Sequence, residues 1–236
     1  GMVAYAQNPT QYQRLREAPW VSCLLGPCYG SPTWFSCMSD FTVMKKGAVM
    51  AVSSPKVTTL ATGEDTPEEE LGGWRIHDEL AGLIDMVGET DEECMDIAKK
   101  FLSYLPSNAT QPPPRVEVPK GSGEKMKNIL NCLPDDRRRA YDIRKIMECF
   151  VDGGELFELK KNFGRSAVTT LARIDGRSVG IVGNNTMFLA GALDAEACEK
   201  ISSFLVLCDS YNIPIIMLVD TPGFMIGKEG ERRKVT

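Results

Sequence analysis

The amino-acid sequence predicts an α/β fold, and three observations carry this prediction. Two β-branched runs flank Asp175-Gly176, a dipeptide typical of tight hairpins. A helical pattern that begins after Asp194 leads into the continuous apolar run 213–219, as expected for a strand of a parallel sheet. Nearer the N-terminus, a short apolar strand enters a glycine turn and then a helix. Strands that alternate with helices in this way favour the α/β class.

Composition limits the function classes that need to be considered. The chain has 236 residues, of which 43% are hydrophobic and 25% charged, enough for one large domain or one and a half smaller ones. Lysine and arginine total 27 against 32 acidic residues, and the acids cluster at 64–70 and 89–96 without an opposing basic stripe. We therefore expect no nucleic-acid partner. No apolar run approaches the roughly 18 residues that a membrane helix needs, so we expect no membrane insertion.

The cysteines and the single histidine restrict the chemistry further. Eight cysteines are present, none in a CxxC spacing, so we expect buried free thiols in a reducing compartment, either the cytoplasm or the mitochondrial matrix of a eukaryote. His77 is the only histidine, which excludes a His-rich metal site and allows a Ser-His-Asp triad only through that residue. We expect no metal, and chemistry that relies on backbone donors or on a cofactor.

The first predicted region, residues 1–106, opens on the strand Val21–Leu25, the turn Gly26–Pro32 and a helix over Thr33–Ser39. A capping box of Thr90 and Glu93 begins the best-defined helix, which Pro106 follows. The remaining expected elements are two short buried strands and one short helix, namely Phe41–Met44, Ala48–Val52 and the segment that starts at Pro55.

Residues 107–136 alternate proline and glycine without apolar periodicity, which predicts a linker. The third region, 137–236, begins with an amphipathic helix over Arg139–Phe150. A hairpin follows, with strands Val168–Ile174 and Arg177–Val182. Asp194 then caps a helix that ends near Asn212, and this helix leads into the strand Ile213–Val219, which we expect to be covered on both faces. The last strand ends at Asp220–Phe224, and α/β proteins place their ligands at such strand ends.

Several of these segments together resemble one enzyme family. The C-terminal half carries LARIDGRSVGIVGN at 171–184, AGALD at 190–194, CDSYNIP at 208–214 and VDTPGF at 219–224. Upstream, GPCYG at 26–30, SDF at 39–41 and ELGG at 70–73 with His77 fit the same order. The chain thus resembles the carboxyltransferase (β) component of biotin-dependent acyl-CoA carboxylases, of the propionyl-CoA and methylcrotonoyl-CoA carboxylase type.

This resemblance implies a crotonase/ClpP-like ββα superhelix, with parts of two such subdomains. The N-terminal one would hold the acyl-CoA, and the C-terminal one would hold biotin delivered by a biotin carboxyl carrier protein or biotin carboxylase subunit. Family members are about twice as long as this chain, so we expect a middle piece of such a protein. In the family, carboxybiotin supplies the carboxyl group and the base, and the protein stabilises enolate-like oxygens with backbone N–H groups. A homo-oligomer is expected.

The resemblance also assigns candidate site residues. Gly30 and Ser31 match a glycine pair that the family uses for the thioester oxygen; here the second glycine is serine, and Pro32 after it has no N–H. The family's second oxyanion hole would fall beyond Thr236. The candidate biotin-side residues are Gly183, Asn184, Gly191, Asp220, Pro222, Gly223, Phe224 and Gly227.

Structural interpretations stand beside these functional ones. Asp220 fits a turn or helix cap better than a general base. The turn at Gly30 could simply start a helix, and Gly183, Asn184 and Gly191 could be plain turn residues. His77 fits a hydrogen-bonded structural role. Among the aromatic and apolar residues beside the turn, Trp34, Phe35 and Met38 fit a core face better than an acyl-contacting wall.

Three further functions stay open. The same fold serves, in reverse, as the α subunit of a biotin-dependent decarboxylase linked to a sodium pump, which a companion membrane subunit encoded nearby would distinguish. A CoA-thioester hydratase or hydrolase of the crotonase type would need a placed acid or base, for which the sequence offers no convincing candidate. A non-catalytic assembly fragment would oligomerise without binding CoA.

Overall fold

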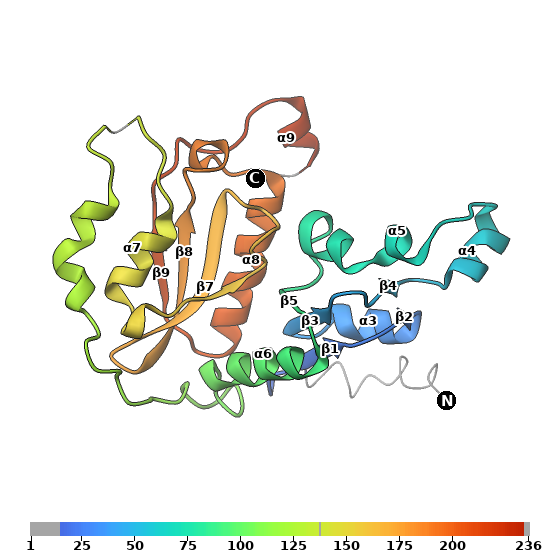
Figure 1. Ribbon diagram of the computed structural model, residues 1–236, viewed down its shortest axis with the longest axis horizontal. Coiled ribbons are helices and arrows are strands. Elements are labelled where there is room, and N and C mark those ends of the chain that lie inside the picture. The colour runs from blue at the N-terminus through green and yellow to red at the C-terminus, as the bar shows by residue number, and fades with distance from the viewer. Residues whose placement is uncertain (1–14, 137, 234–236) are drawn as a thin grey trace. The chain divides into compact units, whose positions relative to one another are not determined.

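The computed structural model describes residues 15–136 and 138–233 of a mixed α/β protein (Figure 1). The chain divides into two compact units, Gly1–Thr110 (unit 1) and Gln111–Thr236 (unit 2). The predicted region boundaries at residues 1, 137 and 236 lie outside the described residues.

Unit 1 contains two small parallel sheets. In the first sheet, β3 lies between β1 and β5, and in the second β2 pairs with β4. The strands are β1 Val21–Leu24, β2 Cys28–Tyr29, β3 Phe41–Lys45, β4 Met50–Ala51 and β5 Met86–Gly88. The expected strands at 21–25 and 41–44 are therefore confirmed, whereas the expected strand at 48–52 shortens to two paired residues.

From residue 15 onward, the helices of unit 1 are α3 Ser31–Cys37, α4 Pro55–Thr62, α5 Glu68–Gly72, a π-helical turn Ile76–Leu80 and α6 Asp91–Tyr104. Helix α3 begins earlier than predicted, because proline is tolerated in the first helical turn. The Thr90 hydroxyl accepts the Glu93 N–H at 3.1 Å as predicted, but the Glu93 carboxylate accepts the N–H of Glu89 instead of that of Thr90. Helix α6 packs on the larger sheet, where the Phe101 and Phe41 rings stack 4.3 Å apart.

Unit 2 is built on a four-stranded sheet in the order β6-β7-β8-β9. Its strands are β6 Phe157–Leu159, β7 Ala167–Ile174, β8 Arg177–Asn184 and β9 Ile215–Leu218. The predicted hairpin is confirmed: β7 and β8 are antiparallel, and Asp175 and Gly176 take φ values of 51° and 73° between them. Strand β9 then runs parallel to β8, as the apolar run predicted.

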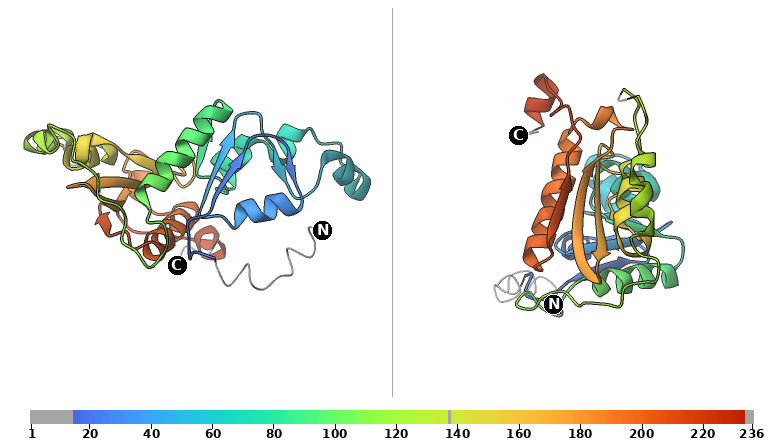
Figure 2. Two further views of the ribbon diagram at one scale, coloured as in Figure 1. Left: turned by 90° about the horizontal axis from the view of Figure 1, so that it is seen from below. Right: turned by 90° about the vertical axis from the view of Figure 1, so that its left-hand side faces the viewer.

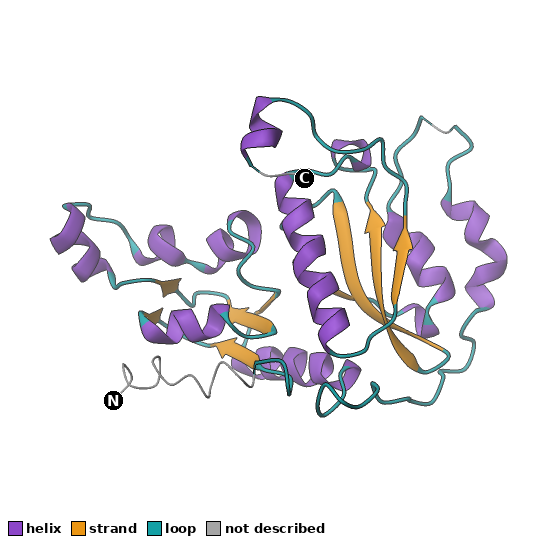
Figure 3. Cartoon of the chain, turned by 180° about the vertical axis from the view of Figure 1, so that it is seen from behind, coloured by secondary structure: helices purple, strands orange, loops and turns teal. Residues whose placement is uncertain are grey.

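Helices α7 and α8 lie on opposite faces of this sheet (Figures 2 and 3). The helical segments of unit 2 are the 3-10 helix η2 Glu124–Cys132, α7 Ile143–Phe150, the short turns Asp152–Gly154 and Leu189–Gly191, α8 Ala195–Ser210 and α9 Lys228–Arg232. Asp142 caps α7, so this helix begins four residues later than predicted. Asp194 caps α8 through the N–H of Ala197, as predicted. Helix η2 lies in the segment for which we expect a linker.

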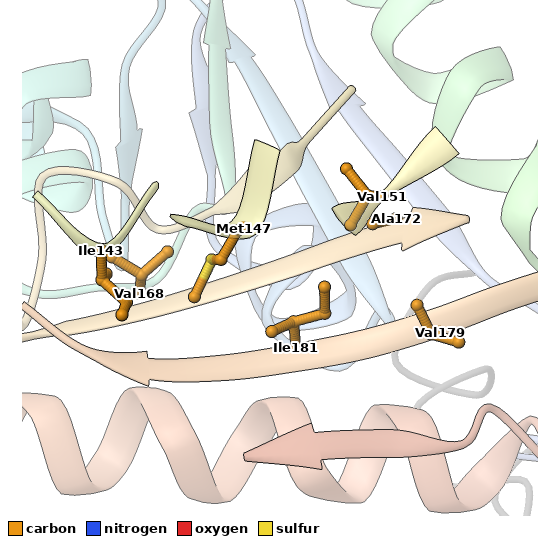
Figure 4. Close-up of a cluster of buried hydrophobic side chains, with 7 residues drawn as sticks. All are labelled: Ile143, Met147, Val151, Val168, Ala172, Val179 and Ile181. Carbon is orange, nitrogen blue, oxygen red and sulfur yellow. The ribbon is translucent and has the colours of Figure 1, made fainter. Parts of the chain in front are cut away.

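The core of unit 2 between the sheet and α7 is apolar (Figure 4). Its buried members are Ile143, Met147, Val151, Val168, Ala172, Val179 and Ile181. Glycines allow both helices to approach β8 closely. A Cβ on Gly183 would lie 2.5 Å from Met147 Cε in α7, and a Cβ on Gly180 would lie 2.5 Å from Cys208 Sγ in α8. The sheet is therefore packed tightly on both faces at its centre.

Strand β9 differs from the expectation of burial on both faces. Ile216 and Leu218 pack against the cluster below α7. Ile215 and Met217, which alternate with them, keep 39% and 53% of their surface exposed. An unbroken apolar run therefore does not prove two-sided burial, because in this structure β9 ends the order of the sheet.

Candidate functional site

The candidate thioester-binding turn of unit 1 lies between β2 and α3. Gly30 takes φ +73°, a conformation that glycine adopts without strain. The N–H groups of Cys28 and Gly30 donate to Val49 O and Ala51 O, at 2.8 and 3.2 Å. Main-chain hydrogen bonds to the β4 segment therefore hold the turn from both sides.

The Thr33 side chain reinforces this turn from inside the unit. It is buried, and its hydroxyl lies 3.0 Å from Cys28 O and 2.9 Å from Ala51 O. Since a hydroxyl has one hydrogen, it donates to one of these carbonyls at a time. Thr33 thereby links the start of α3 to both paired strands.

The two predicted donors of the turn are not equivalent. The Gly30 N–H is already engaged with Ala51 O. The Ser31 N–H lies at the first position of α3, where a helix provides no acceptor of its own. Space is available beside the turn, because the nearest atom to a Cβ built on Gly30 is Val52 O at 3.9 Å. Strand pairing therefore uses the Gly30 N–H, and Ser31 supplies the N–H that is left for a ligand.

Of two side chains beside the turn, that of His77 agrees with its prediction and that of Trp34 does not. His77 is buried and its Nε2 lies 2.6 Å from Met50 O, which confirms a hydrogen-bonded structural role. Trp34, expected in the core, is 44% exposed, because Thr33 and Ser36 take the buried side of the short helix α3. Its ring packs on that of Phe35, with centroids 5.5 Å apart.

In unit 2, Asn184 connects the two loops that follow the parallel strands. Its side-chain amide donates to Gly191 O at 3.2 Å, and its carbonyl oxygen accepts the Asp220 N–H at 3.2 Å. Asn184 is buried at the end of β8, and its bond to Gly191 O is shielded from water, whereas its bond to Asp220 is partly buried. Gly191 takes φ +81°, and a Cβ on it would lie 2.8 Å from Asp220 O. The loops meet so closely here that only glycine fits without displacement.

The Asp220 carboxylate is held by a tyrosine that the sequence did not indicate. Tyr141 Oη donates to Asp220 Oδ2 at 2.6 Å. Burial, followed by the hydrogen bond and negative charge of Asp220, raises the pKa of Tyr141 to about 12. Thr186 fixes Tyr141 in turn, because its hydroxyl accepts the Tyr141 N–H and lies 2.9 Å from Tyr141 O. Asp220 is thus tied into the structure, in agreement with its interpretation as a turn residue.

The segment after Asp220 pairs with the loop before α8. Leu193 N donates to Gly223 O at 3.0 Å, and Met225 N donates to Leu193 O at 2.8 Å. The Thr221 hydroxyl accepts the Gly223 N–H at 3.0 Å and closes a local turn. Gly223 takes φ +126° with open space around it, and Phe224 is 52% exposed. An accessible backbone and an apolar ring therefore lie side by side.

The structure brings together most of the candidate biotin-side residues. Asn184, Gly191, Asp220, Gly223 and Phe224 belong to the hydrogen-bonded loops. Gly183 does not, because its Cα faces Met147 of α7 and its role is packing. Pro222 is an exposed residue of the same turn, and Gly227 precedes α9. The sequence showed no signal for Tyr141, which precedes a helix cap and reaches Asp220 only through the fold.

Residues 15–136 and 138–233 contain no group of three or more histidine, cysteine, aspartate or glutamate side chains that could hold a metal ion. In the same part of the chain, none of the helices is long and apolar enough to span a bilayer.

Comparisons with known proteins identify the family of the chain. Residues 1–236 match the family described as "Carboxyl transferase domain". The methylmalonyl-CoA carboxyltransferase 12S subunit of Propionibacterium freudenreichii subsp. shermanii is 38% identical over 213 residues, which cover 90% of this chain and 40% of the relative. The propionyl-CoA carboxylase carboxyltransferase subunit of Haloferax mediterranei is 37% identical over 219 residues, covering 92% and 42%. The methylmalonyl-CoA decarboxylase subunit alpha of Veillonella parvula is 34% identical over 214 residues, covering 90% and 42%.

A solved structure extends the likeness to three dimensions. The transcarboxylase 12S structure, described as a hexamer with hydrolysed methylmalonyl-coenzyme A bound, matches with a TM-score of 0.88 and 36% identity over 94% of this chain and 43% of the other. The chain thus spans about two fifths of the length of the curated relatives that it matches. The resemblance seen in the sequence is confirmed: the chain belongs to the carboxyl transferase domain family and is related to propionyl-CoA carboxylase β chains and the methylmalonyl-CoA carboxyltransferase 12S subunit.

Proposed function

We propose that this chain forms part of a carboxyltransferase that moves a carboxyl group from carboxybiotin to an acyl-CoA. Units 1 and 2 then correspond to parts of two crotonase-like ββα subdomains, one for each substrate. The observation that carries the proposal is the turn at Gly30 and Ser31, which combines a left-handed glycine with an N–H at a helix start. The family match over residues 1–236 supports the same activity.

We propose propionyl-CoA and methylmalonyl-CoA as the uncarboxylated and carboxylated forms of the substrate. Relatives named for these two thioesters are 38%, 37% and 34% identical to this chain. The matching 12S structure is described with hydrolysed methylmalonyl-coenzyme A bound. These two thioesters differ by one carboxyl group, so the proposed reaction interconverts them.

On the acyl side, the chain's contribution is a hydrogen-bond donor. Removal of the α-proton of a thioester places negative charge on the thioester oxygen, and a fixed N–H aimed at that oxygen stabilises the charge by several kcal/mol. Ser31 N–H supplies this donor in the proposal. The bonds of Gly30 and Thr33 to the β4 segment keep it in place, so the donor does not have to reorganise during the reaction.

On the biotin side, the hydrogen-bonded loops of unit 2 provide the surface. Bound carboxybiotin supplies the carboxyl group and a base for the α-proton. The backbone at Gly223 is open, with no atom within 4 Å of a built Cβ, and Phe224 beside it is half-exposed. This combination fits a flat ring with polar edges. In the proposal, Asn184 and Tyr141 hold the loop through Asp220, and Gly191 permits the close contact beneath it.

The proposal includes partners that the chain does not contain. A biotin carboxyl carrier protein, alone or joined to a biotin carboxylase subunit, would present carboxybiotin to unit 2. We also propose a homo-oligomer, in line with the relative whose structure is described as a hexamer. Because relatives 37–38% identical are more than twice as long, the remaining segments of a full-length protein would complete both sites.

Specific observations support two alternatives to this function. Methylmalonyl-CoA decarboxylase α subunits from Veillonella parvula and Propionigenium modestum are 34% and 31% identical to this chain, so the reverse reaction is the second candidate. A non-catalytic assembly fragment is the third, because the chain covers only about two fifths of its relatives. Binding of acyl-CoA separates this third function from the other two.

The test is calorimetric titration of the protein with methylmalonyl-CoA, propionyl-CoA, acetyl-CoA and free CoA. We expect micromolar binding of the first two thioesters. A Gly30→Val variant should weaken that binding at least tenfold, because the branched side chain fills the space beside the Ser31 N–H. Free CoA should bind equally to the wild type and the variant.

Gly47→Val is the matched control for this variant. Gly47 also lies in unit 1, takes φ +83° and has open space around a built Cβ, so valine there also strains a positive-φ backbone, but away from the turn. The proposal fails if both variants lose binding equally, or if Gly30→Val binds as the wild type does. A folded wild-type protein that oligomerises and binds no thioester would favour the assembly fragment.

A further inference from the structure

Two cysteines of unit 2 lie in direct contact, and neither belongs to the candidate ligand loops described above. Cys132 ends the 3-10 helix η2, and Cys149 lies one residue before the end of α7. Their Sγ atoms are 3.6 Å apart. Both thiols also lie near one carbonyl oxygen, that of Lys145, at 3.6 Å for Cys132 and 3.2 Å for Cys149. The two side chains therefore converge on the same point from two packed elements.

The contact needs little change to become a covalent bond. In a disulfide the sulfur atoms are about 2 Å apart, so this pair has to close by about 1.5 Å. The polar contacts of the two thiols are to Lys145 O and to each other. Helix η2 packs directly against α7, so the two backbones already lie side by side.

We infer that Cys132 and Cys149 are a redox modification site, which a hydroperoxide oxidises to an intramolecular disulfide. The exposure of the two thiols sets their order of reaction. Cys132 is partly exposed and meets the oxidant first, whereas Cys149 is buried. Burial, and then the hydrogen bond with Cys132, raise the pKa of the Cys149 thiol, while the Lys125 ammonium opposes this rise. Cys149 is therefore the thiol that reacts second.

The chemistry balances with one equivalent of peroxide. The Cys132 thiolate attacks the peroxide, the O–O bond breaks and an S–O bond forms, so that Cys132 becomes a sulfenic acid and one water (or alcohol) leaves with the thiol proton. Cys149 Sγ then attacks the sulfenic sulfur, the S–S bond forms, the S–O bond breaks and a second water leaves with the Cys149 proton. Two thiols lose two electrons in all, and the peroxide gains them. A small thiol reverses the step by disulfide exchange.

The oxidised form ties η2 to α7. The closed loop runs from 132 to 149, and the cross-link removes freedom from a segment that otherwise follows a proline- and glycine-rich stretch. We therefore expect amide hydrogen exchange in 124–132 to slow on oxidation and to recover on reduction. The acyl side in unit 1 should not respond.

The test treats the full chain with one equivalent of hydrogen peroxide, alkylates the remaining thiols after denaturation, and maps tryptic peptides with and without reductant. Arginines and lysines between the two cysteines place them on separate peptides. We expect one cross-linked peptide pair containing Cys132 and Cys149, which reductant separates. In a Cys149→Ser variant, Cys132 should be trapped by dimedone as the sulfenic acid.

Cys198→Ser is the matched control, because Cys198 has the same intermediate exposure as Cys132 and lies in the same unit. It should leave the cross-link unchanged. Cys149→Ala replaces Cys149→Ser if circular dichroism shows that the hydroxyl disturbs α7. The inference is overturned if both thiols of the wild type are alkylated after peroxide treatment, or if the disulfides formed join other cysteines or separate chains.

Discussion

The two units hold their candidate ligand loops by different means. In unit 1 the Gly30 turn is fixed by main-chain bonds to the β4 segment, with one buried hydroxyl, that of Thr33, in support. In unit 2 the loops after β8 and β9 share two main-chain bonds at Leu193, and polar side chains add to these, with Asn184 between Gly191 and Asp220, and Tyr141 on Asp220. The first arrangement depends mainly on strand pairing, and the second on both main-chain bonds and a few polar side chains.

This difference determines which substitutions each unit tolerates. A turn held by strand pairing survives most side-chain changes but is sensitive to backbone conformation. Loops that are held in part by a buried amide, such as that of Asn184, lose stability when this partner is removed and the backbone groups that it bonded stay buried. All three tryptophans, at 20, 34 and 74, belong to unit 1, so their fluorescence follows the unfolding of that unit.

The largest expected effect is a difference in the free energy of unfolding between substitutions of Gly191 and Gly30. Gly191→Ala should destabilise unit 2 by about 4 kcal/mol, because it adds backbone strain at φ +81° and a Cβ only 2.8 Å from Asp220 O. Gly30→Ala should cost unit 1 less, about 2 kcal/mol, because its backbone conformation (φ 73°, ψ −129°) is strained for alanine but the nearest atom to its Cβ lies 3.9 Å away. Denaturant unfolding followed by peptide-resolved hydrogen exchange measures each unit. Equal losses would show that crowding in unit 2 adds nothing to the strain.

The next largest effect depends on pH and concerns Lys200 of α8. This lysine is 1% exposed, and its Nζ donates to Phe163 O and Ala167 O at 3.0 and 2.9 Å. Burial lowers the pKa of Lys200 from its ordinary 10.5 to about 8. Between these two pH values the folded protein has released the proton and the unfolded chain still binds it. The free energy of unfolding should therefore rise with pH in this range, by up to about 3 kcal/mol.

A Lys200→Met variant isolates this contribution. The stability of the wild type minus that of the variant should grow from pH 8 to pH 10.5, since other titrating groups are common to both proteins. Below pH 8 the difference should be constant. Urea unfolding at a series of pH values measures it, and hydrogen exchange should locate the change in unit 2. A difference that does not vary with pH would mean that folding leaves the protonation of Lys200 unchanged.

The sequence predicted those parts of the fold that short-range chemistry specifies. Asp175-Gly176 identified the hairpin, and Thr90 and Asp194 identified two helix starts, because turn and cap residues act on their immediate neighbours. It did not predict the one-sided exposure of β9 or the two-residue strand β2, since these depend on which segments pack against them. A lysine in a helical pattern predicts a surface position, and only the fold shows that Lys200 is buried.

The candidate sites divide in the same way. The loop at Asp220 and the turn at Gly30 could be found from the sequence, because glycine after a strand marks both. Gly183 was assigned to the loop surface, although its lack of a side chain accommodates Met147. Tyr141 lies 79 residues from Asp220 along the chain, and no local pattern connects them. Residues that support a site from a distance therefore require the structure.

A pair of matched substitutions sharpens the comparison between side-chain and main-chain support. Asn184→Ala should cost unit 2 about 2 kcal/mol, because Gly191 O and Asp220 N–H lose their shared partner. Thr33→Val keeps the shape of the side chain and should cost unit 1 less, about 1 kcal/mol, because strand pairing still holds the turn. Tryptophan fluorescence measures unit 1, and hydrogen exchange measures unit 2. A larger loss in unit 1 would reverse the comparison.

The smallest expected effect tests whether Tyr141 positions the loop or merely packs beside it. Tyr141→Phe keeps the ring and removes the bond to Asp220 Oδ2, which is partly open to solvent, so it should cost about 1 kcal/mol or less. The same change should remove one late-ionising phenol, since the pKa of Tyr141 is raised to about 12. Ultraviolet titration checks this loss, and hydrogen exchange at 220–225 should become faster. Unchanged exchange there would assign Tyr141 a packing role, and Asn184 would then be the main support of the loop.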